Sequence, residues 1–352
     1  MSTSAAEAKS DLAAQIPSCS HKQTLLEEAD VNSEATCPAL CDDLLAKIFA
    51  RTMRRSSIRS QLRLKRVSRL AHNVVGREMG KKDELLVEIL DPTEYRIIGL
   101  RKEKLPRPEQ NIIVQGSLVH TMDEALKLVK EAVGAMRTLK TLRLYSREND
   151  SEQGNFTSVI QELLGKGNVQ LETVKFRRKR VGTGATDSIV RLVEENADSL
   201  HSLGQLGLSE AIQCFAGKPM ALERLSLNEF DGGFDADQES ICERMIQLMS
   251  TGITATHLSY SSLQGFDPTD EVVQRFLTSF ECESLRLTMM KGPYVPSLPD
   301  YMIGKVRHVQ KLEMVEVVEK TNIFNTLITY EKMLHKVFPN VEDVNFLQDW
   351  RR

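Results

Sequence analysis

The chain has 352 residues, of which 41% are hydrophobic and 27% are charged, and its net charge is −3. These values are ordinary for a globular protein, and they give no general reason to expect nucleic acid or an anionic membrane among its partners. No apolar run reaches the length of about 18 residues that a membrane span requires. The length allows one large domain, or a small module followed by a larger one.

The N-terminal segment, residues 1–36, is small, polar and acidic, without the basic start or the apolar stretch of a secretory signal. We expect it to be a disordered tail. Without a secretory signal the reducing cytosol is the expected compartment, with the nucleus as the alternative, and the cysteines are expected to be free thiols. Their scattered positions lack the paired spacing of a zinc site, so we expect no metal. These cysteines are Cys19, Cys37, Cys41, Cys214, Cys242 and Cys282.

Residues 37–80 gather apolar side chains at helical spacing, and the run "RTMRRSS" divides them into two groups. The first group suits one broad helix face, and the second continues through two shorter helices, the last of which Ser68 is expected to cap. A module this small cannot bury such a surface by itself. It therefore either docks on the rest of the chain or is covered by another protein. The first group is Leu40, Leu44, Leu45, Ile48 and Phe49, and the second is Ile58, Leu62, Leu64, Val67, Leu70 and Val74.

The stretch "LCDDLLAKIF…LRLKRVSRL" resembles the F-box. The usual pattern of that family is Leu-Pro-acidic-acidic-Leu-Leu, then Ile-Phe or Ile-Leu, a gap, and Leu-x-Leu-x-x-Val-Ser-Arg/Lys. The matching residues are Leu40, Asp42, Asp43, Leu44, Leu45, Ile48, Phe49, Leu62, Leu64, Val67, Ser68 and Arg69. Cys41 stands where the family usually has proline, and Ala71 where an aromatic residue is common.

By this resemblance the module docks on a Skp-type adaptor, and through it on a cullin–RING ubiquitin ligase. The helix face would then anchor in an apolar groove of the adaptor. A helical cap on the end of a repeat array would show the same periodicity, so that alternative stays open. The expected adaptor-binding residues are Leu40, Cys41, Leu44, Leu45, Ile48, Phe49, Leu62, Leu64 and Val67.

Residues 81–110 include the linker-like run "LRKEKLPRPEQ", and we assign them to a linker or a first irregular segment. From residue 111 to 352, short strands of Leu-x-Leu type alternate with amphipathic helical segments at roughly 20 to 30 residues. One such helix is expected at 121–136, where apolar residues recur at spacings of three and four. The strand cores begin at Leu142, Val174, Leu206, Leu225, Leu258, Leu285, Leu312 and Val344, with Ile112 as an earlier candidate.

Units of this kind bury their hydrophobic faces by stacking on their neighbours, which is typical of a solenoid. The array resembles irregular leucine-rich repeats, most closely in "LERLSLNEF" at residues 222–230, where Asn228 follows Leu-x-x-Leu-x-Leu. A doubly wound α/β sheet also alternates strands and helices, but no strand here ends in a glycine-rich phosphate turn. We therefore predict an α/β protein with a small three-helix F-box at the N-terminus, followed by a leucine-rich-repeat-like strand–helix solenoid.

An F-box followed by leucine-rich repeats is a family architecture in its own right. The resemblance implies a substrate-recognition subunit of an SCF-type E3 ubiquitin ligase, which is not an enzyme itself, needs no cofactor and brings a target close to the ligase. The P-loop, zinc-protease and nucleophile-elbow motifs are absent from the sequence. We interpret "VGTGATDS" at residues 181–188 as a turn from strand to helix rather than a phosphate site. The alternative function is a repeat scaffold unrelated to ubiquitin, whose N-terminal helices only cap the solenoid.

The residue between the two apolar residues of each strand should face the opposite, concave side, as should the residue two places earlier. The first row is Arg143, Lys175, Gly207, Ser226, Ser259, Arg286, Glu313 and Asn345, and the second is Thr141, Thr173, Gln205, Arg224, His257, Ser284, Lys311 and Asp343. Cations outnumber carboxylates there, which favours an acidic or phosphorylated target segment. The alternative is that these are ordinary solvated residues and that binding uses loops.

The candidate target-binding residues are Arg143, Lys175, Arg177, Arg224, His257 and Arg286. Arg177 also opens the basic run "RRKR". This run is a candidate nuclear localisation signal or contact for an acidic partner, and its alternative is a solvated strand end.

Overall fold

The computed structural model describes residues 42–91, 94–100, 116–146, 153–177, 186–228, 238–262, 271–289, 306–316, 334–342 and 344–348. The chain divides into two units, 1–41 and 42–352, and every described residue belongs to the second. The expected tail lies outside the described residues, as do Leu40, Cys41, the candidate strand at Ile112, and the basic run after Arg177.

Three helices begin the described chain: α1 (Asp42–Arg55), α2 (Ile58–Leu64) and α3 (Arg69–Gly80). A serine in extended conformation precedes each of the last two helices, and its hydroxyl accepts a hydrogen bond from a backbone N–H of the first turn. Ser57 accepts from Ser60 at 3.3 Å, and Ser68 accepts from Ala71 at 3.0 Å. The prediction that Ser68 caps the last helix is confirmed.

A β-hairpin follows the helices, where a linker or irregular segment was expected. Strands β1 (Glu84–Asp91) and β2 (Glu94–Leu100) pair antiparallel, and β3 (Ser117–Val119) pairs antiparallel with β2. Buried and half-buried residues alternate strictly along β2, as they do in a strand with one face on the core. The described part of residues 81–110 is therefore mostly regular sheet.

From β4 onward every strand pairs in parallel with the next strand along the chain, and β4 itself pairs in parallel with β1. The order across the sheet is β11-β10-β9-β8-β7-β6-β5-β4-β1-β2-β3. A doubly wound sheet reverses its strand order at a switch point, and the order from β4 to β11 contains no reversal. The strands are β4 (Leu139–Ser146), β5 (Val169–Arg177), β6 (Ser202–Leu206), β7 (Ala221–Asn228), β8 (Thr254–Ser262), β9 (Ser284–Met289), β10 (Lys311–Glu316) and β11 (Val344–Gln348).

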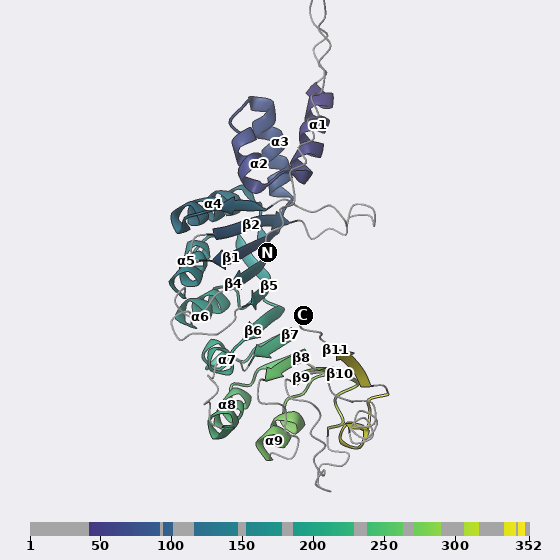
Figure 1. The fold of residues 1–352 in the computed structure, drawn as a ribbon. Coiled ribbons are helices and arrows are strands. Elements are labelled where there is room, and N and C mark those ends of the chain that lie inside the picture. The colour runs from purple at the N-terminus through teal and green to yellow at the C-terminus, as the bar shows by residue number, and fades with distance from the viewer. Residues whose placement is uncertain are drawn as a thin grey trace, which may run out of the picture. The chain divides into compact units, whose positions relative to one another are not determined.

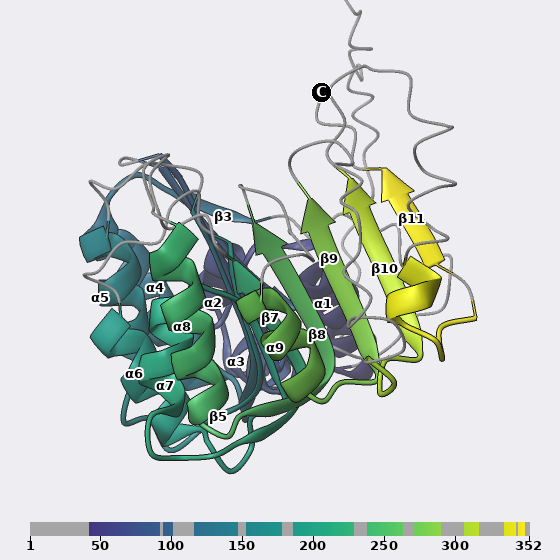
Figure 2. The same cartoon turned by 90° about the horizontal axis from the view of Figure 1, so that it is seen from below.

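A helix separates each strand from the next between β3 and β9, and these helices lie along one face of the sheet (Figures 1 and 2). Right-handed crossovers between parallel strands place helices in this way. The helix expected at 121–136 is confirmed, and its apolar residues Ala125, Leu128, Val129, Ala132 and Val133 are buried. The helices are α4 (Met122–Ala135), α5 (Gln153–Leu163), α6 (Thr186–Glu195), α7 (Leu208–Phe215), α8 (Gln238–Ser250) and α9 (Glu271–Ser279). The fold is thus α/β, with a long and mostly parallel sheet.

A six-residue motif recurs at the strands from β4 to β11, with apolar residues at its first, fourth and sixth positions. These side chains are buried wherever they are described, except that β6 has its third buried residue one place late, at Leu206. The second, third and fifth positions carry polar residues, except for Gly204 at the fifth position in β6. The motif begins at Leu139, Leu171, Leu200, Leu222, Ala255, Cys282, Val309 and Val341.

The backbone repeats along with the side chains. In four neighbouring pairs of units, the carbonyl of the residue at the second position accepts a hydrogen bond from the N–H of the second-position residue of the next unit, and in two of them it also accepts from the following N–H. His201 accepts from Glu223 and Arg224 at 2.8 and 3.1 Å, and Glu283 accepts from Gln310 and Lys311 at 2.8 and 3.1 Å. These units are therefore joined to their neighbours through the same local arrangement, as in stacked repeats.

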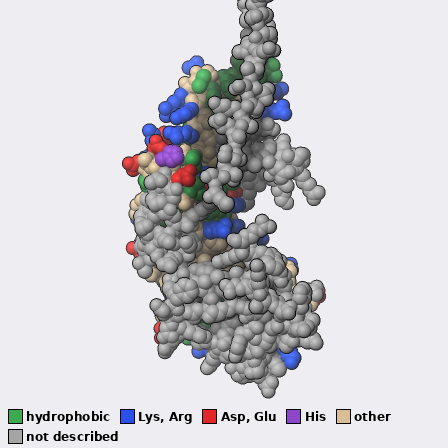
Figure 3. Space-filling model, viewed as in Figure 1, with side chains coloured by type: hydrophobic (Ala, Val, Ile, Leu, Met, Phe, Trp, Pro, Cys, Tyr) green, Lys and Arg blue, Asp and Glu red, His purple; other side chains and the backbone are tan. Residues whose placement is uncertain are grey.

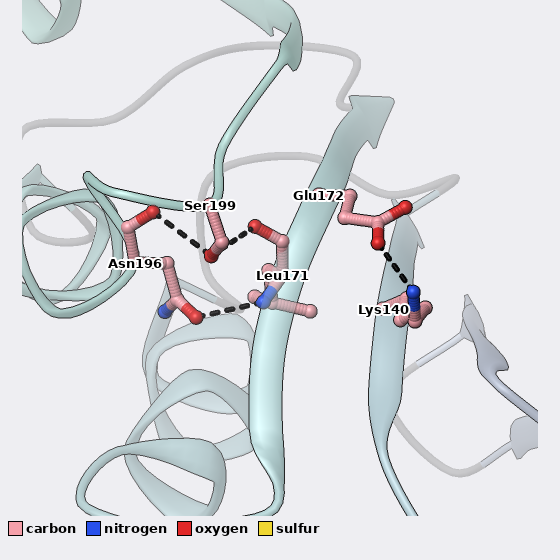
Figure 4. A network of polar contacts seen from close by, with 5 residues as sticks. All are labelled: Lys140, Leu171, Glu172, Asn196 and Ser199. Carbon is pink, nitrogen blue, oxygen red and sulfur yellow. Dashed lines mark hydrogen bonds and ion pairs between the residues drawn. The ribbon is translucent and has the colours of Figure 1, made fainter.

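Polar side chains tie the start of β5 to the turn that follows α6 (Figure 4). The buried Asn196 accepts from the Leu171 N–H at 2.8 Å and donates to the Leu192 carbonyl at 2.8 Å. Ser199 donates to the Leu171 carbonyl at 3.0 Å. The peptide groups of Leu171 are thereby satisfied inside the protein, where an unpaired group would be costly.

One predicted strand is misplaced. The strand core expected at Leu206 is the end of β6, and Gly207 already precedes α7, with its N–H donating to the carboxylate of Glu210 at 3.2 Å. In register, Leu203 pairs with Leu225 and Leu206 with Leu227, so β6 holds one more residue than β7 between these pairs. That residue is Gln205, whose φ of 60° lies in the left-handed region.

An extra residue of this kind is a β-bulge. Because the strand core begins at Leu203 rather than at Leu206, other residues of β6 belong to the two predicted rows. Gly204, rather than Gly207, pairs with Lys175, and Ser202, rather than Gln205, pairs with Thr173 and Arg224.

Candidate functional site

The N-terminal helices expose apolar side chains at positions that the sequence singled out. Leu44 and Ile48 of α1 are 49% and 48% exposed, and Val67, between α2 and α3, is 70% exposed. Leu44 and Ile48 are four residues apart, so they are neighbours on one face of α1. Hydrophobic side chains are visible at the position of α1 in Figure 3.

The remaining expected contact residues are less accessible. Leu45 and Phe49 are half-buried, and Leu62 and Leu64 of α2 are half-buried against the core. Leu40 and Cys41 lie outside the described residues. The structure thus brings three of the expected residues to the surface and holds four others partly inside it.

The same helices are also anchored to the sheet domain. Met53, Ile58, Val75 and Met79 are buried in the core that the strands share. The backbone N–H of Arg59 donates to the Ser117 hydroxyl on β3 at 2.8 Å. The helical module therefore buries part of its apolar surface against the rest of the chain and leaves another part exposed.

Ala71, which stands where an aromatic residue is common in the F-box family, is 1% exposed on α3. A much larger side chain there would have to displace close-packed neighbours. Alanine therefore suits the packing at this position.

A second surface lies on the sheet face opposite α4 to α9, which we call the open face. The third and fifth motif positions of neighbouring strands lie side by side there, because the strands are in parallel register. Lys175 of β5 pairs with Arg143 of β4 on one side and with Gly204 of β6 on the other. Arg224 of β7 is in the next row, in register with Ser202. Lys and Arg side chains gather at the position of these strands in Figure 3.

Arg143, Lys175 and Arg224, which we call the cation cluster, differ in their partners. Arg143 Nε lies 2.7 Å from a carboxylate oxygen of Glu84 on β1, whose side chain is only 8% exposed. Arg224 Nε lies 3.3 Å from Glu223, and both side chains are exposed, so this pair is weak. No carboxylate of the described residues lies within ion-pairing distance of Lys175 Nζ.

The charges of the cluster act on Lys175. Partial burial of its ammonium group lowers the pKa of Lys175, and the positive charges of Arg143 and Arg224 lower it further. Glu84 opposes this effect. Because Arg143 and Arg224 both disfavour the charged form of Lys175, a bound anion would relieve repulsion among the three groups.

The other candidate target-binding residues lie apart from the cluster or at its margin. Arg177 is exposed at the end of β5, and His257 of β8 is in register with Arg224. Arg286 of β9 forms an ion pair at 3.7 Å with Glu313 of β10. The predicted rows contain Gly207 and Gln205 where the structure has Gly204 and Ser202. Counting the six-residue motif from Leu200 would have placed Gly204 and Ser202 in these rows.

No protein-family model and no curated protein matches the chain. In the described part, no helix is long and apolar enough to cross a membrane, and no group of three or more His, Cys, Asp or Glu side chains is placed to hold a metal ion. Cys214 and Cys282 are buried free thiols.

Proposed function

We propose that the protein is the substrate-recognition subunit of an SCF-type E3 ubiquitin ligase, acting in the cytosol or nucleus. Residues 37–80 form the F-box that binds a Skp-type adaptor, and the strand–helix array is a leucine-rich-repeat-like solenoid that binds the target. In this role the protein catalyses no reaction and uses no cofactor. It raises the local concentration of target lysines near the ubiquitin-conjugating enzyme.

The exposure of Leu44, Ile48 and Val67 is the observation that carries this proposal. Exposed large apolar residues on a helical module that is otherwise anchored to a core suit a surface that a partner covers. The resemblance assigns all three to the adaptor interface. The strand order and the recurrent six-residue motif support the solenoid, because each unit buries its apolar residues against its neighbours.

A pull-down of the full chain with a purified Skp-type adaptor tests the proposal. Leu44→Asp and Ile48→Asp should abolish capture, because each places a charge in an apolar contact. Ile246→Asp is the matched control, since Ile246 of α8 is 39% exposed and far along the chain. The control should retain capture, and circular dichroism should show all variants folded. Absence of capture by the unaltered chain would reject the F-box assignment.

The alternative function is a repeat scaffold whose N-terminal helices cap the array. The burial of Met53, Ile58 and Met79 in the shared core favours a capping contribution. The two roles are compatible in one module, because different residues serve them. The scaffold becomes the preferred function if the folded chain captures no adaptor.

A further inference from the structure

The cation cluster surrounds a place on the open face where a side chain is missing. Gly204 lies beside Lys175 on β5, and Ser226 follows at the corresponding position of β7. A Cβ atom added at Gly204 would lie 3.5 Å from Cγ of Lys175, which is ordinary contact. A Cβ atom would therefore fit there, and glycine leaves this position of β6 without a side chain between Lys175 and the residues of β7.

The backbone of β6 is irregular at the same place. Gln205 adopts a left-handed conformation, and two residues rather than one separate the core-facing Leu203 and Leu206. The pairing of β5 with β6 extends only to Lys175 and Gly204. Bulges and left-handed non-glycine residues are over-represented at functional sites, where they re-aim side chains.

Small hydroxyl residues line the adjacent row. Thr173 and Ser202 pair across β5 and β6, and Ser202 pairs with Arg224 across β6 and β7. Neighbouring strands are about 4.8 Å apart, so Lys175 and Arg224 approach the space over Gly204 from opposite sides. Ammonium, guanidinium and hydroxyl donors thus surround one small area of the sheet.

We propose that the cation cluster and Gly204 form a binding site for a phosphorylated side chain of the target protein. This inference deepens the proposed function, and it rests on that function for the identity of the ligand as a target. The phosphate lies over β6, where Lys175 and Arg224 donate to its oxygens.

The charge balance favours a phosphate group. Arg143 is paired with the buried Glu84, which acts on Lys175 only at longer range, so Lys175 and Arg224 are the two cations without a buried carboxylate at ion-pairing distance among the described residues. A phosphomonoester carries a charge of about −1.5 to −2 at pH 7, which matches these two cations. It also presents three acceptor oxygens to the surrounding donors, whereas a carboxylate presents two.

The test uses the full chain and an array of immobilised peptides, each made in phosphoserine, serine and glutamate forms. The phosphoserine forms should retain at least ten times more protein than the other two, and inorganic phosphate should compete. Lys175→Gln and Arg224→Gln should each weaken retention at least tenfold. Gly204→Leu should do the same without a change of charge, because its side chain would occupy the space over β6.

Lys311→Gln is the matched control, because Lys311 is an exposed third-position lysine on β10, far from the cluster in strand order. It should leave retention unchanged. Equal retention of the three peptide forms, or equal losses in Lys311→Gln and Lys175→Gln, would overturn the proposal. Equal binding of a labelled single-stranded oligonucleotide with the same dependence on Lys175 would also overturn it, in favour of a general polyanion surface.

The adaptor pull-down separates this inference from the proposed function. Lys175→Gln should capture the adaptor as the unaltered chain does. If the adaptor binds and no phosphopeptide does, only the phosphate site is rejected. If phosphopeptides bind and the adaptor does not, the ligase role is rejected and the site remains.

Discussion

The guanidinium Nε of Arg143 lies 2.7 Å from the carboxylate of Glu84, across the parallel pairing of β1 and β4. The two residues belong to different structural parts, since Glu84 opens the hairpin and Arg143 lies in the first strand of the repeated array. The carboxylate is almost fully buried, whereas the arginine side chain is 36% exposed. Glu84 therefore holds one of the three clustered cations and reduces its availability to a ligand.

Glu84→Gln should destabilise the protein and strengthen phosphopeptide binding. Arg143 would lose its carboxylate, which costs about 1–3 kcal/mol for a partly buried charged partner. The freed guanidinium would add to the positive potential over Gly204. Urea unfolding and the peptide array measure the two effects.

Glu88→Gln is the control for this substitution, because Glu88 on the same strand pairs with Arg96 of β2 at 3.1 Å rather than with a cation of the cluster. It should cost stability without changing peptide binding. Weaker phosphopeptide binding in Glu84→Gln would contradict the role given to Arg143.

Asn196→Leu should lower the free energy of unfolding by about 2–3 kcal/mol, because it leaves the buried N–H of Leu171 without its acceptor. Ser199→Ala removes a single hydroxyl from the same turn and should cost about 1 kcal/mol. Chemical denaturation of both variants checks the difference. An Asn196→Leu variant as stable as the parent would show that the turn after α6 does not depend on these bonds.

Lys82 should make stability depend on pH in the alkaline range. Burial lowers the pKa of Lys82 from 10.5 to about 8, and Glu78 opposes this shift. Between these two pH values the unfolded chain binds a proton that the folded chain has lost, so the free energy of unfolding rises with pH. Below the lower value both states are protonated, and the cost of burying the charge, about 3 kcal/mol, is fully present.

Lys82→Met should therefore stabilise the protein at pH 7 and remove this contribution between about pH 8 and 10.5. Urea unfolding at pH 7, 8.5 and 10 provides the measurement. Lys81→Met is the comparison, since Lys81 is exposed and pairs with Glu78 at 2.5 Å. A parent chain and Lys82→Met variant with parallel pH profiles would rule out a perturbed lysine.

Gln205→Gly should leave stability unchanged or raise it by up to about 1 kcal/mol. Glycine relieves the left-handed conformation, and this gain is partly offset by the greater freedom of glycine in the unfolded chain. Gln213→Gly, at an exposed position inside α7, should instead destabilise by about 1 kcal/mol. Thermal unfolding of the pair measures the contrast. Equal destabilisation by both would argue against strain at the bulge.

Local patterns in the sequence predict much of this fold. Spacings of three and four residues in "DEALKLVKEAV" place α4, and most Leu-x-Leu strand cores lie in the expected strands because burial on one face imposes a period of two. The hairpin was not predicted, although burial alternates strictly along β2, because the charged, proline-containing run "LRKEKLPRPEQ" that begins at its last residue is typical of a linker. The short helix α7 was missed as well, which shifted the predicted strand from Leu203 to Leu206.

The candidate binding surfaces were less predictable, because they depend on pairing between distant strands. The sequence indicates that Arg143 and Lys175 are polar positions of successive strands. It does not indicate that Glu84 lies beside Arg143, since a hairpin and a helix separate them along the chain. Gly204 takes the place predicted for Gly207, because the core of β6 begins at Leu203 rather than at Leu206, and this changes which residues are neighbours across the strands.

Strand β3 has only three residues and forms the last strand at its end of the sheet. A short edge offers few free N–H and C=O groups to a strand of another molecule. The helix α2 contacts this strand, and the Arg59 N–H bonds to Ser117 within it. The N-terminal helices thus also protect an open sheet from end-to-end association, and loss of α2 would favour aggregation through this edge.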